Sequence, residues 1–427
     1  MRIADRTIAP QVYGVEKITL PKIDRLQLSN GIQVHCINAG VQEVTKIEIM
    51  FDGGRWQEPL RSVAAATSKT ILDGTKSKTS QQISEAIEFF GASVNADAAI
   101  DYSHITLFTL TKHLPSLLPL LHEVISEASF PERELNTYIQ NSKQRLMVNL
   151  QKVDFLAHKE FNERLYGKLH PNGYTTAAED YDFITNDVLQ KFHAQVYKQG
   201  GCKIIIAGKA GDAELKLLDD HFGKDVRTHS NGKEKIFAVE TTRDQKFWVE
   251  KNDSVQSAIR IGRHCINKQH TDFPSMRVLN TIFGGYFGSR LMQNLREEKG
   301  YCYGVHSSLI SFQKTAHLSV STEVGKDVTQ AAVNEIYNEL NRLRTEIIPE
   351  EELQLVKNYL LGVILADADG AFNVAEIVRG LVVYDQTEKN FYESIEKIKS
   401  VTSNELQVLA QKYFDPQTMI EVVAGAK

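Results

Sequence analysis

The chain has 427 residues, of which 42% are hydrophobic and 24% charged, so it can bury more than one core and is not mainly disordered. Its 49 Lys and Arg residues against 54 Asp and Glu residues give a net charge of −5, which excludes a basic footprint for nucleic acid or an anionic membrane. The four cysteines stand far apart with no Cys-x-x-Cys pair, so neither a disulfide scaffold nor a cysteine zinc cluster is expected.

Strand and helix patterns alternate along the first half of the chain. Residues 25–37 alternate apolar and polar side chains around Asn30-Gly31, a dipeptide favoured in tight hairpin turns. A helix is expected from Thr79, whose spacing to Gln82 is that of a capping box. The other predicted elements of this half are strands over residues 45–51, 104–110 and 203–208 and helices over residues 60–72, 114–128 and 131–150.

The second half of the sequence repeats the plan of the first. The segment PERELNTYIQNSKQRLM begins at Pro131 and PEEELQLVKNYLLGVIL begins at Pro349, an offset of 349 − 131 = 218 residues. Both start with Pro at the first helical position, followed by an acidic first turn and a Leu. The matched order predicts two tandem α+β domains, 1–223 and 236–427, joined by a polar linker at 224–235. Each domain is expected to be a mainly antiparallel sheet with helices packed on one face.

Several catalytic motifs are missing from the sequence. No two of the 13 histidines lie three to five residues apart, so a zinc site with two ligands one helical turn apart cannot form. A zinc site assembled from distant histidines stays open, although nothing in the sequence favours it. A phosphate-binding loop and a Gly-x-Ser-x-Gly nucleophile elbow are also missing.

The most distinctive segment is FGGYFGSRLMQNLREEKGYCYGV, residues 283–305. A flexible glycine-rich loop should lead into a short helix over residues 290–299, and a strand should follow. Arg296 and Tyr303 can then project toward one another, and together they would donate hydrogen bonds to a carbonyl oxygen or an oxyanion. On residue chemistry alone, a solvated Arg beside a half-buried Tyr is the commoner arrangement. The glycines of the loop are Gly284, Gly285 and Gly288.

Residues 284–303 resemble the C-terminal half of a pitrilysin/insulinase-type peptidase, the inverzincin family that includes the mitochondrial processing peptidase. The shared pattern is a glycine-rich stretch, then Ser-x-Leu, then Leu-Arg-Glu-x-x-Gly-x-x-Tyr. The resemblance extends to the internal duplication, to Asn95-Ala96 and to His170-Pro171. It implies a mitochondrial processing peptidase-like fold in which Arg296 and Tyr303 bind the substrate carbonyl next to the scissile bond. Asn95, Ala96 and the three loop glycines are the further substrate-binding positions that it implies.

The chain departs from this family at the zinc motif His-x-x-Glu-His. With Gly74-Thr75 as the anchor, the two ligand histidines fall at Ala65 and Lys69, and the general-base glutamate falls at Ser68. The third ligand, a Glu, falls at Arg145. Alanine has no donor atom and the two cations would repel Zn²⁺, so no zinc is expected in this chain.

The resemblance therefore implies a zinc-less subunit of a heterodimeric zinc endopeptidase. A homologous partner subunit would supply zinc and the general base, while this chain supplies Arg296 and Tyr303, and the two would close around an unfolded peptide. Two alternatives stay open: a structural subunit like the core proteins of respiratory complexes, and an active peptidase with an unrecognised metal site. A homodimer also stays open. The sequence contains neither an apolar run of about 18 residues nor an N-terminal apolar signal region, which predicts a cytoplasmic protein, or a periplasmic one if a signal segment was removed.

Overall fold

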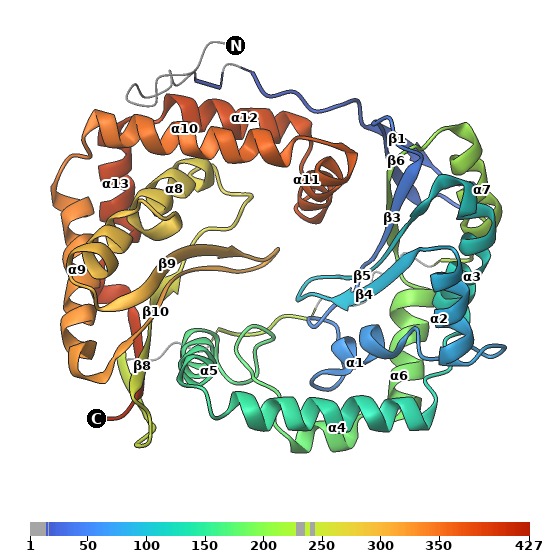
Figure 1. Cartoon of the computed structure of the whole chain (residues 1–427), viewed down its shortest axis with the longest axis horizontal. Helices are drawn as coiled ribbons and strands as arrows, with labels where there is room; N and C mark the ends of the chain where they lie inside the picture. The colour runs from blue at the N-terminus through green and yellow to red at the C-terminus, as the bar shows by residue number, and fades with distance from the viewer. Residues whose placement is uncertain (1–13, 16, 228–234, 240–243) are drawn as a thin grey trace, which may run out of the picture.

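The computed structural model of the chain describes residues 14–15, 17–227, 235–239 and 244–427. Its two halves each contain one β-sheet, and they lie on opposite sides of the molecule in Figure 1. The expected linker at 224–235 falls largely on residues outside this described part, and we retain the domain boundary there as a proposal.

The N-terminal sheet has six strands. They are β1 (Asp24–Gln27), β2 (Gln33–Asn38), β3 (Val44–Phe51), β4 (Ser93–Ala98), β5 (Ser103–Leu110) and β6 (Cys202–Gly208). Their spatial order is β1-β2-β6-β3-β5-β4, and every neighbouring pair is antiparallel except β2 and β6. The predicted hairpin is formed by β1 and β2, and Gly31 in its turn has the left-handed φ of 87° that glycine tolerates.

The C-terminal sheet has five strands. They are β7 (Lys246–Glu250), β8 (Gln256–His264), β9 (Cys302–Ser311), β10 (Ala316–Gly325) and β11 (Ile420–Gly425). Their order is β7-β11-β8-β10-β9, with one parallel pair, β7 and β11. This pattern matches β2-β6-β3-β5-β4 of the first sheet strand for strand, so the predicted fold of two tandem, mainly antiparallel α+β domains is confirmed.

The helices follow the same duplication. Those of the first half are α1 (Val63–Thr70), α2 (Ser80–Phe89), α3 (Leu114–Glu127), α4 (Glu132–Asn149), α5 (Val153–Tyr166), α6 (Asn186–His193) and α7 (Asp212–Phe222). Those of the second half are α8 (Phe273–Asn280), α9 (Thr329–Thr345), α10 (Glu350–Asp367), α11 (Ala371–Val383), α12 (Glu388–Ser400) and α13 (Ser403–Tyr413). The start of α2 carries the predicted capping box of Thr79 and Gln82. Both α4 and α10 have 18 residues, follow a Pro and open with glutamates.

The two halves exchange helices. In Figure 1 the long helices α4 and α10 run along opposite edges of the molecule, and each leads into a helix that contacts the other half. Helix α5 packs Ala157 and Phe161 against Val422 of the C-terminal sheet. Helix α11 packs Val374 and Val378 against the N-terminal sheet. Each sheet therefore has its own helices on one face and a helix of the other half on the second face, which the local sequence pattern did not indicate.

A group of four charged side chains, two of them buried on β3 and two partly exposed on α11, links α11 to the N-terminal sheet. On β3, Lys46 Nζ lies 3.2 Å from Glu48 Oε2, and their side chains are 3% and 0% exposed. From α11, Arg379 Nη1 lies 3.0 Å from Glu48 Oε1, and Glu376 pairs with both Lys46 and Arg379. Buried charges are tolerated only when they are paired, so this group specifies how α11 sits on the sheet.

Histidines and a tyrosine gather where α5 meets the C-terminal half. Tyr166 Oη and His317 Nδ1 lie 2.8 Å apart, and the His170 ring stacks on the Tyr166 ring at a centroid distance of 4.9 Å. His264 Nε2 donates to the carbonyl oxygen of Leu165 at 2.6 Å. Burial lowers the pKa of His170 to about 4 and that of His317 to about 3. Burial also lowers the pKa of His264, so these imidazoles are neutral at pH 7.

Substitution of Arg379 by Ala should leave the carboxylate of Glu48 buried with one partner fewer. The free energy of unfolding is then expected to fall by about 3 kcal/mol, the scale for breaking a buried pair, as measured by urea denaturation. The control is Lys191→Ala, which removes an exposed pair with Asp187 and should leave the urea midpoint nearly unchanged. Equal urea midpoints for the two variants would show that the contact of Arg379 with Glu48 does not stabilise the fold.

Acidification should destabilise the fold through the buried histidines. Because their pKa values are lower in the folded state, the unfolded state binds more protons below pH about 6.5, and stability is lost as the pH falls from there toward about 4. Each histidine should lower the free energy of unfolding by about 2 kcal/mol between pH about 7.5 and about 5. The free energy of unfolding should depend less steeply on pH in His317→Gln than in the wild-type chain. A urea midpoint that does not change between pH about 7.5 and about 5 would contradict this prediction.

Candidate functional site

Three of the four degenerate zinc positions lie on α1 and the fourth lies on α4, a helix that contacts α1. Ala65 and Lys69 are one turn apart, so they share a helix face, as two metal ligands would. Ser68 points elsewhere: its Oγ lies 2.6 Å from Tyr197 Oη, and both residues are buried. The general-base position is thus occupied by a hydroxyl that already has a partner.

Lys69 reaches the edge of the N-terminal sheet. Its Nζ lies 3.4 Å from the carbonyl oxygen of Ala96 and 3.2 Å from Asp97 Oδ2, both on β4. Strand β4 is an edge strand, where Asn95 is exposed and Ala96 is buried opposite Ile105 of β5. The structure therefore brings one degenerate zinc position together with the two predicted peptide-binding positions.

Arg145 is exposed on α4 and lies near two tyrosines. Burial raises the pKa of Tyr138 to about 12 and raises that of Tyr181, and in both cases the positive charge of Arg145 opposes the rise. Neither this guanidinium, nor the ammonium of Lys69, nor the methyl group of Ala65 can ligate Zn²⁺. Within the described ranges there is also no group of three or more His, Cys, Asp or Glu side chains that could hold a metal ion.

The degenerate zinc positions form the first half-site, and Arg296 and Tyr303 form the second. A tight turn before β9 positions the second half-site. Residues Met292–Glu298 form a π-helical turn within the expected helix, and Gly300, with φ of +63°, reverses the chain into the strand. Arg296 is on the turn and Tyr303 on the strand, and the Cζ atom of Arg296 lies 5.7 Å from the centroid of the Tyr303 ring. Tyr303 is 94% exposed, and its hydroxyl has no hydrogen-bond partner among the described residues. The phenol is therefore free to donate to a ligand.

A third side chain, Phe287, completes this second half-site. Its ring centroid lies 4.6 Å from Arg296 Cζ, so two aromatic rings, those of Phe287 and Tyr303, lie within cation–π range of the guanidinium. The same guanidinium lies 3.4 Å from Glu297 Oε1. Sequence reasoning did not identify Phe287, although an apolar aromatic residue placed among the loop glycines was an available signal.

The loop glycines serve close packing. A Cβ atom on buried Gly284 would lie 2.8 Å from Ser307 Cβ on β9, and one on Gly288 would lie 2.9 Å from the Tyr286 ring. Gly285 is exposed, at the end of the π-helical turn Thr281–Gly285. Close packing against β9 thus accounts for Gly284 without a bound peptide, whereas the contact at Gly288 is with the Tyr286 side chain alone. The substrate-binding roles of the three loop glycines stay predictions.

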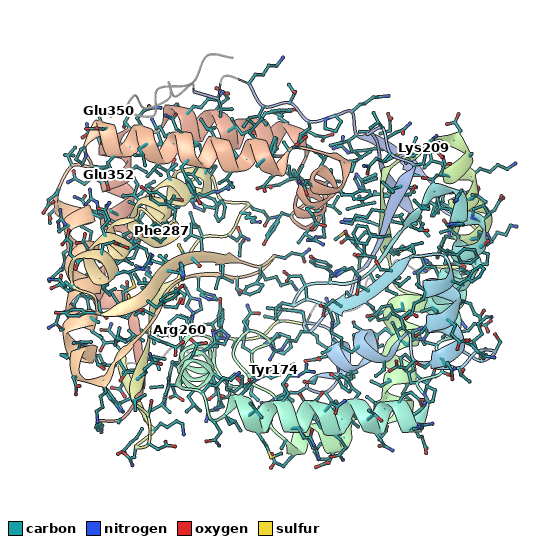
Figure 2. The ribbon with its side chains drawn as sticks, viewed as in Figure 1. Tyr174, Lys209, Arg260, Phe287, Glu350 and Glu352 are labelled. Carbon is teal, nitrogen blue, oxygen red and sulfur yellow. The ribbon has the colours of Figure 1, made fainter. Side chains whose placement is uncertain are left out.

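The two half-sites belong to opposite halves of the chain. Figure 2 labels Phe287 in the C-terminal half, whereas α1 lies in the N-terminal half on the other side of the molecule in Figure 1.

No helix in the described part of the chain is long and apolar enough to cross a membrane.

Comparisons with known proteins agree on one family. Residues 34–175 match the model of the insulinase family, peptidase family M16, and residues 184–360 match the model described as the peptidase M16 inactive domain. Two relatives come from Bacillus subtilis: the uncharacterized zinc protease YmxG, 24% identical over 80% of this chain and 83% of its own length, and the probable inactive metalloprotease YmfF, 24% identical over 80% and 84%. A crystal structure of a peptidase M16 inactive domain from Pseudomonas fluorescens superposes with a TM-score of 0.86 at 21% identity, covering 95% of this chain and 98% of the other. Two sheets of the same strand order and these matches show that the chain belongs to the insulinase (M16) family of peptidases, and its sequence lacks the His-x-x-Glu-His zinc motif.

Proposed function

We propose that this chain is the zinc-less subunit of a two-chain zinc endopeptidase. A homologous partner subunit would hold zinc and the general base, and this chain would contribute Arg296 and Tyr303 to the shared active site. The observation that carries the proposal is an asymmetry. The Arg296 and Tyr303 pair is intact, with Tyr303 exposed and Arg296 partly exposed, whereas all four zinc and base positions carry side chains that cannot do that chemistry.

The chemistry assigned to the pair is binding of the substrate carbonyl and of the oxyanion that forms from it. A guanidinium donates through a planar fork of N–H groups, and a phenol adds one O–H donor. Donors that are already in place when negative charge develops on an oxygen stabilise the transition state strongly. A metal in the partner would polarise the same carbonyl and lower the pKa of its bound water.

The peptide is proposed to bind as an added strand, a mode that uses the unpaired backbone groups of a sheet edge. Asn95 and Ala96 on β4 are proposed contacts, because β4 is an edge strand. In this chain the ammonium of Lys69 lies against the carbonyl oxygen of Ala96, so a peptide that pairs there must displace that contact.

The family members named above are consistent with a division of labour between chains. One relative is named a zinc protease and another a probable inactive metalloprotease. Copurification from the native cell tests the assembly: a zinc-bearing homologue of similar length is expected. Unrelated subunits in its place would favour a structural role and overturn the proposal.

The zinc content of the purified chain tests the loss of the metal site. The wild-type chain should hold much less than one zinc per chain by elemental analysis, because its four positions offer no ligand. A variant with Ala65→His, Lys69→His and Arg145→Glu restores three donors and should gain zinc, whereas the control Lys69→His alone should not. One tightly bound zinc per wild-type chain would contradict the assignment.

Arg296→Ala tests the role of the pair in the assembled peptidase. Loss of one oxyanion donor should lower turnover of the complex by about 10²–10³-fold. The matched control is Arg164→Ala, because Arg164 also lies over an aromatic ring, that of Phe247 at 4.2 Å, but belongs to α5. Full activity of the Arg296→Ala complex would overturn the proposed function.

A further inference from the structure

We propose that Phe287 is a positioning residue for Arg296, holding the guanidinium between its own ring and that of Tyr303 in the orientation needed to meet a substrate carbonyl. The inference rests on the proposed function and assigns a role to a residue outside the Arg and Tyr pair. Its experiment is chosen so that the two can fail separately.

We call the rings of Phe287 and Tyr303, which lie near the Arg296 guanidinium, the clamp. Arg296 Cζ lies 4.6 Å from the Phe287 ring centroid and 5.7 Å from the Tyr303 ring centroid, both within the range of a cation–π contact. The Arg296 side chain is 29% exposed, and its ion pair is with the adjacent residue Glu297 at 3.4 Å. The two aromatic rings therefore restrict the orientation of the Arg296 side chain, which is long and otherwise has many rotamers.

Neither ring is needed to fill a core. Phe287 is 66% exposed and Tyr303 is 94% exposed, whereas neighbouring Leu291 and Leu295 are fully buried. An exposed Phe side chain contributes little to folding, since most of its apolar surface stays in water. Its place over the guanidinium is thus better explained by what it does to Arg296 than by stability.

The loop is built to present Phe287 on this side. Tyr286, just before it, is in an extended conformation with φ of −154° and ψ of 173°, and its ring packs on Tyr359 of α10 at 4.9 Å. Tyr286 is thus anchored on α10, and the turn that follows at Phe287 and Gly288 places the Phe287 ring 4.6 Å from Arg296 Cζ.

A pre-oriented guanidinium loses less conformational entropy when the transition state forms, so the clamp should act on turnover more than on substrate binding. In the complex with the zinc-bearing subunit, Phe287→Ala should lower kcat about fivefold with KM nearly unchanged, the scale of an exposed cation–π contact. Phe287→Trp should keep full turnover and Phe287→Leu should not, because leucine is apolar but has no aromatic face.

A second readout needs no partner and no activity. In the full chain carrying ¹³C-labelled arginine, the Arg296 Cδ protons should resonate upfield because they lie near aromatic rings, and Arg296→Lys assigns the signal by removing it. The signal should move downfield in Phe287→Ala and Phe287→Leu and stay upfield in Phe287→Trp. The control Phe183→Ala, which removes a Phe of 63% exposure from the N-terminal half, should leave both the signal and kcat unchanged.

Each outcome decides between the claims. If the Arg296 signal does not respond to Phe287→Ala, the clamp does not exist and this inference fails while the proposed function stands. An unchanged kcat in Phe287→Ala would overturn the positioning role, and a rise in KM alone would show that Phe287 contributes to substrate binding instead. If Arg296→Ala itself leaves turnover unchanged, the proposed function is wrong, and the positioning role of Phe287, which rests on it, is wrong as well.

Discussion

The exchange of α5 and α11 between the two halves is the constraint on which the rest of the structure depends. Each sheet buries one face under its own helices, and the second face packs against a helix from the other half, α11 on the N-terminal sheet and α5 on the C-terminal sheet. At α11 the covering helix also brings Glu376 and Arg379 to the buried charges of β3, which leaves little freedom in how it docks. The same join holds the degenerate zinc positions and the Arg296–Tyr303 pair in opposite halves of one chain, and the proposed function assigns the missing groups to a partner subunit.

The side chains at two of the degenerate zinc positions, Ser68 and Lys69, make contacts within the chain. Ser68 shares a buried hydrogen bond with Tyr197, and Lys69 contacts the edge strand β4 through the carbonyl oxygen of Ala96 and the carboxylate of Asp97. A lysine against an edge strand discourages pairing with other chains, so a peptide can add to β4 only if it displaces the contact of Lys69 with Ala96. The C-terminal half-site, in contrast, keeps exposed donors and supports them with an aromatic ring.

Much of the fold could be predicted from local sequence signals. The Asn30-Gly31 turn and the Thr79–Gln82 capping box appear where the pattern placed them, because each depends on neighbouring residues alone. The helices expected at Pro131 and Pro349 also form, but each proline is the N-cap and the helix begins one residue later. The exchange of α5 and α11 could not be predicted, since an apolar helix face does not say which sheet it will cover. At the site, the spacing of Arg296 and Tyr303 brought them together as expected, whereas Phe287 and the contact of Lys69 with β4 depend on tertiary packing that no spacing rule encodes.

Reconstitution from separate subunits tests the central claim most directly. A zinc-bearing homologue from the same cell would be purified alone, and this chain would be titrated into it while cleavage of an unfolded peptide is followed. The account predicts little cleavage by either chain alone, and activity that rises with added chain and saturates at one copy per zinc-bearing subunit. Full activity of the homologue without this chain, or peptide cleavage by this chain in the absence of any companion, would contradict it.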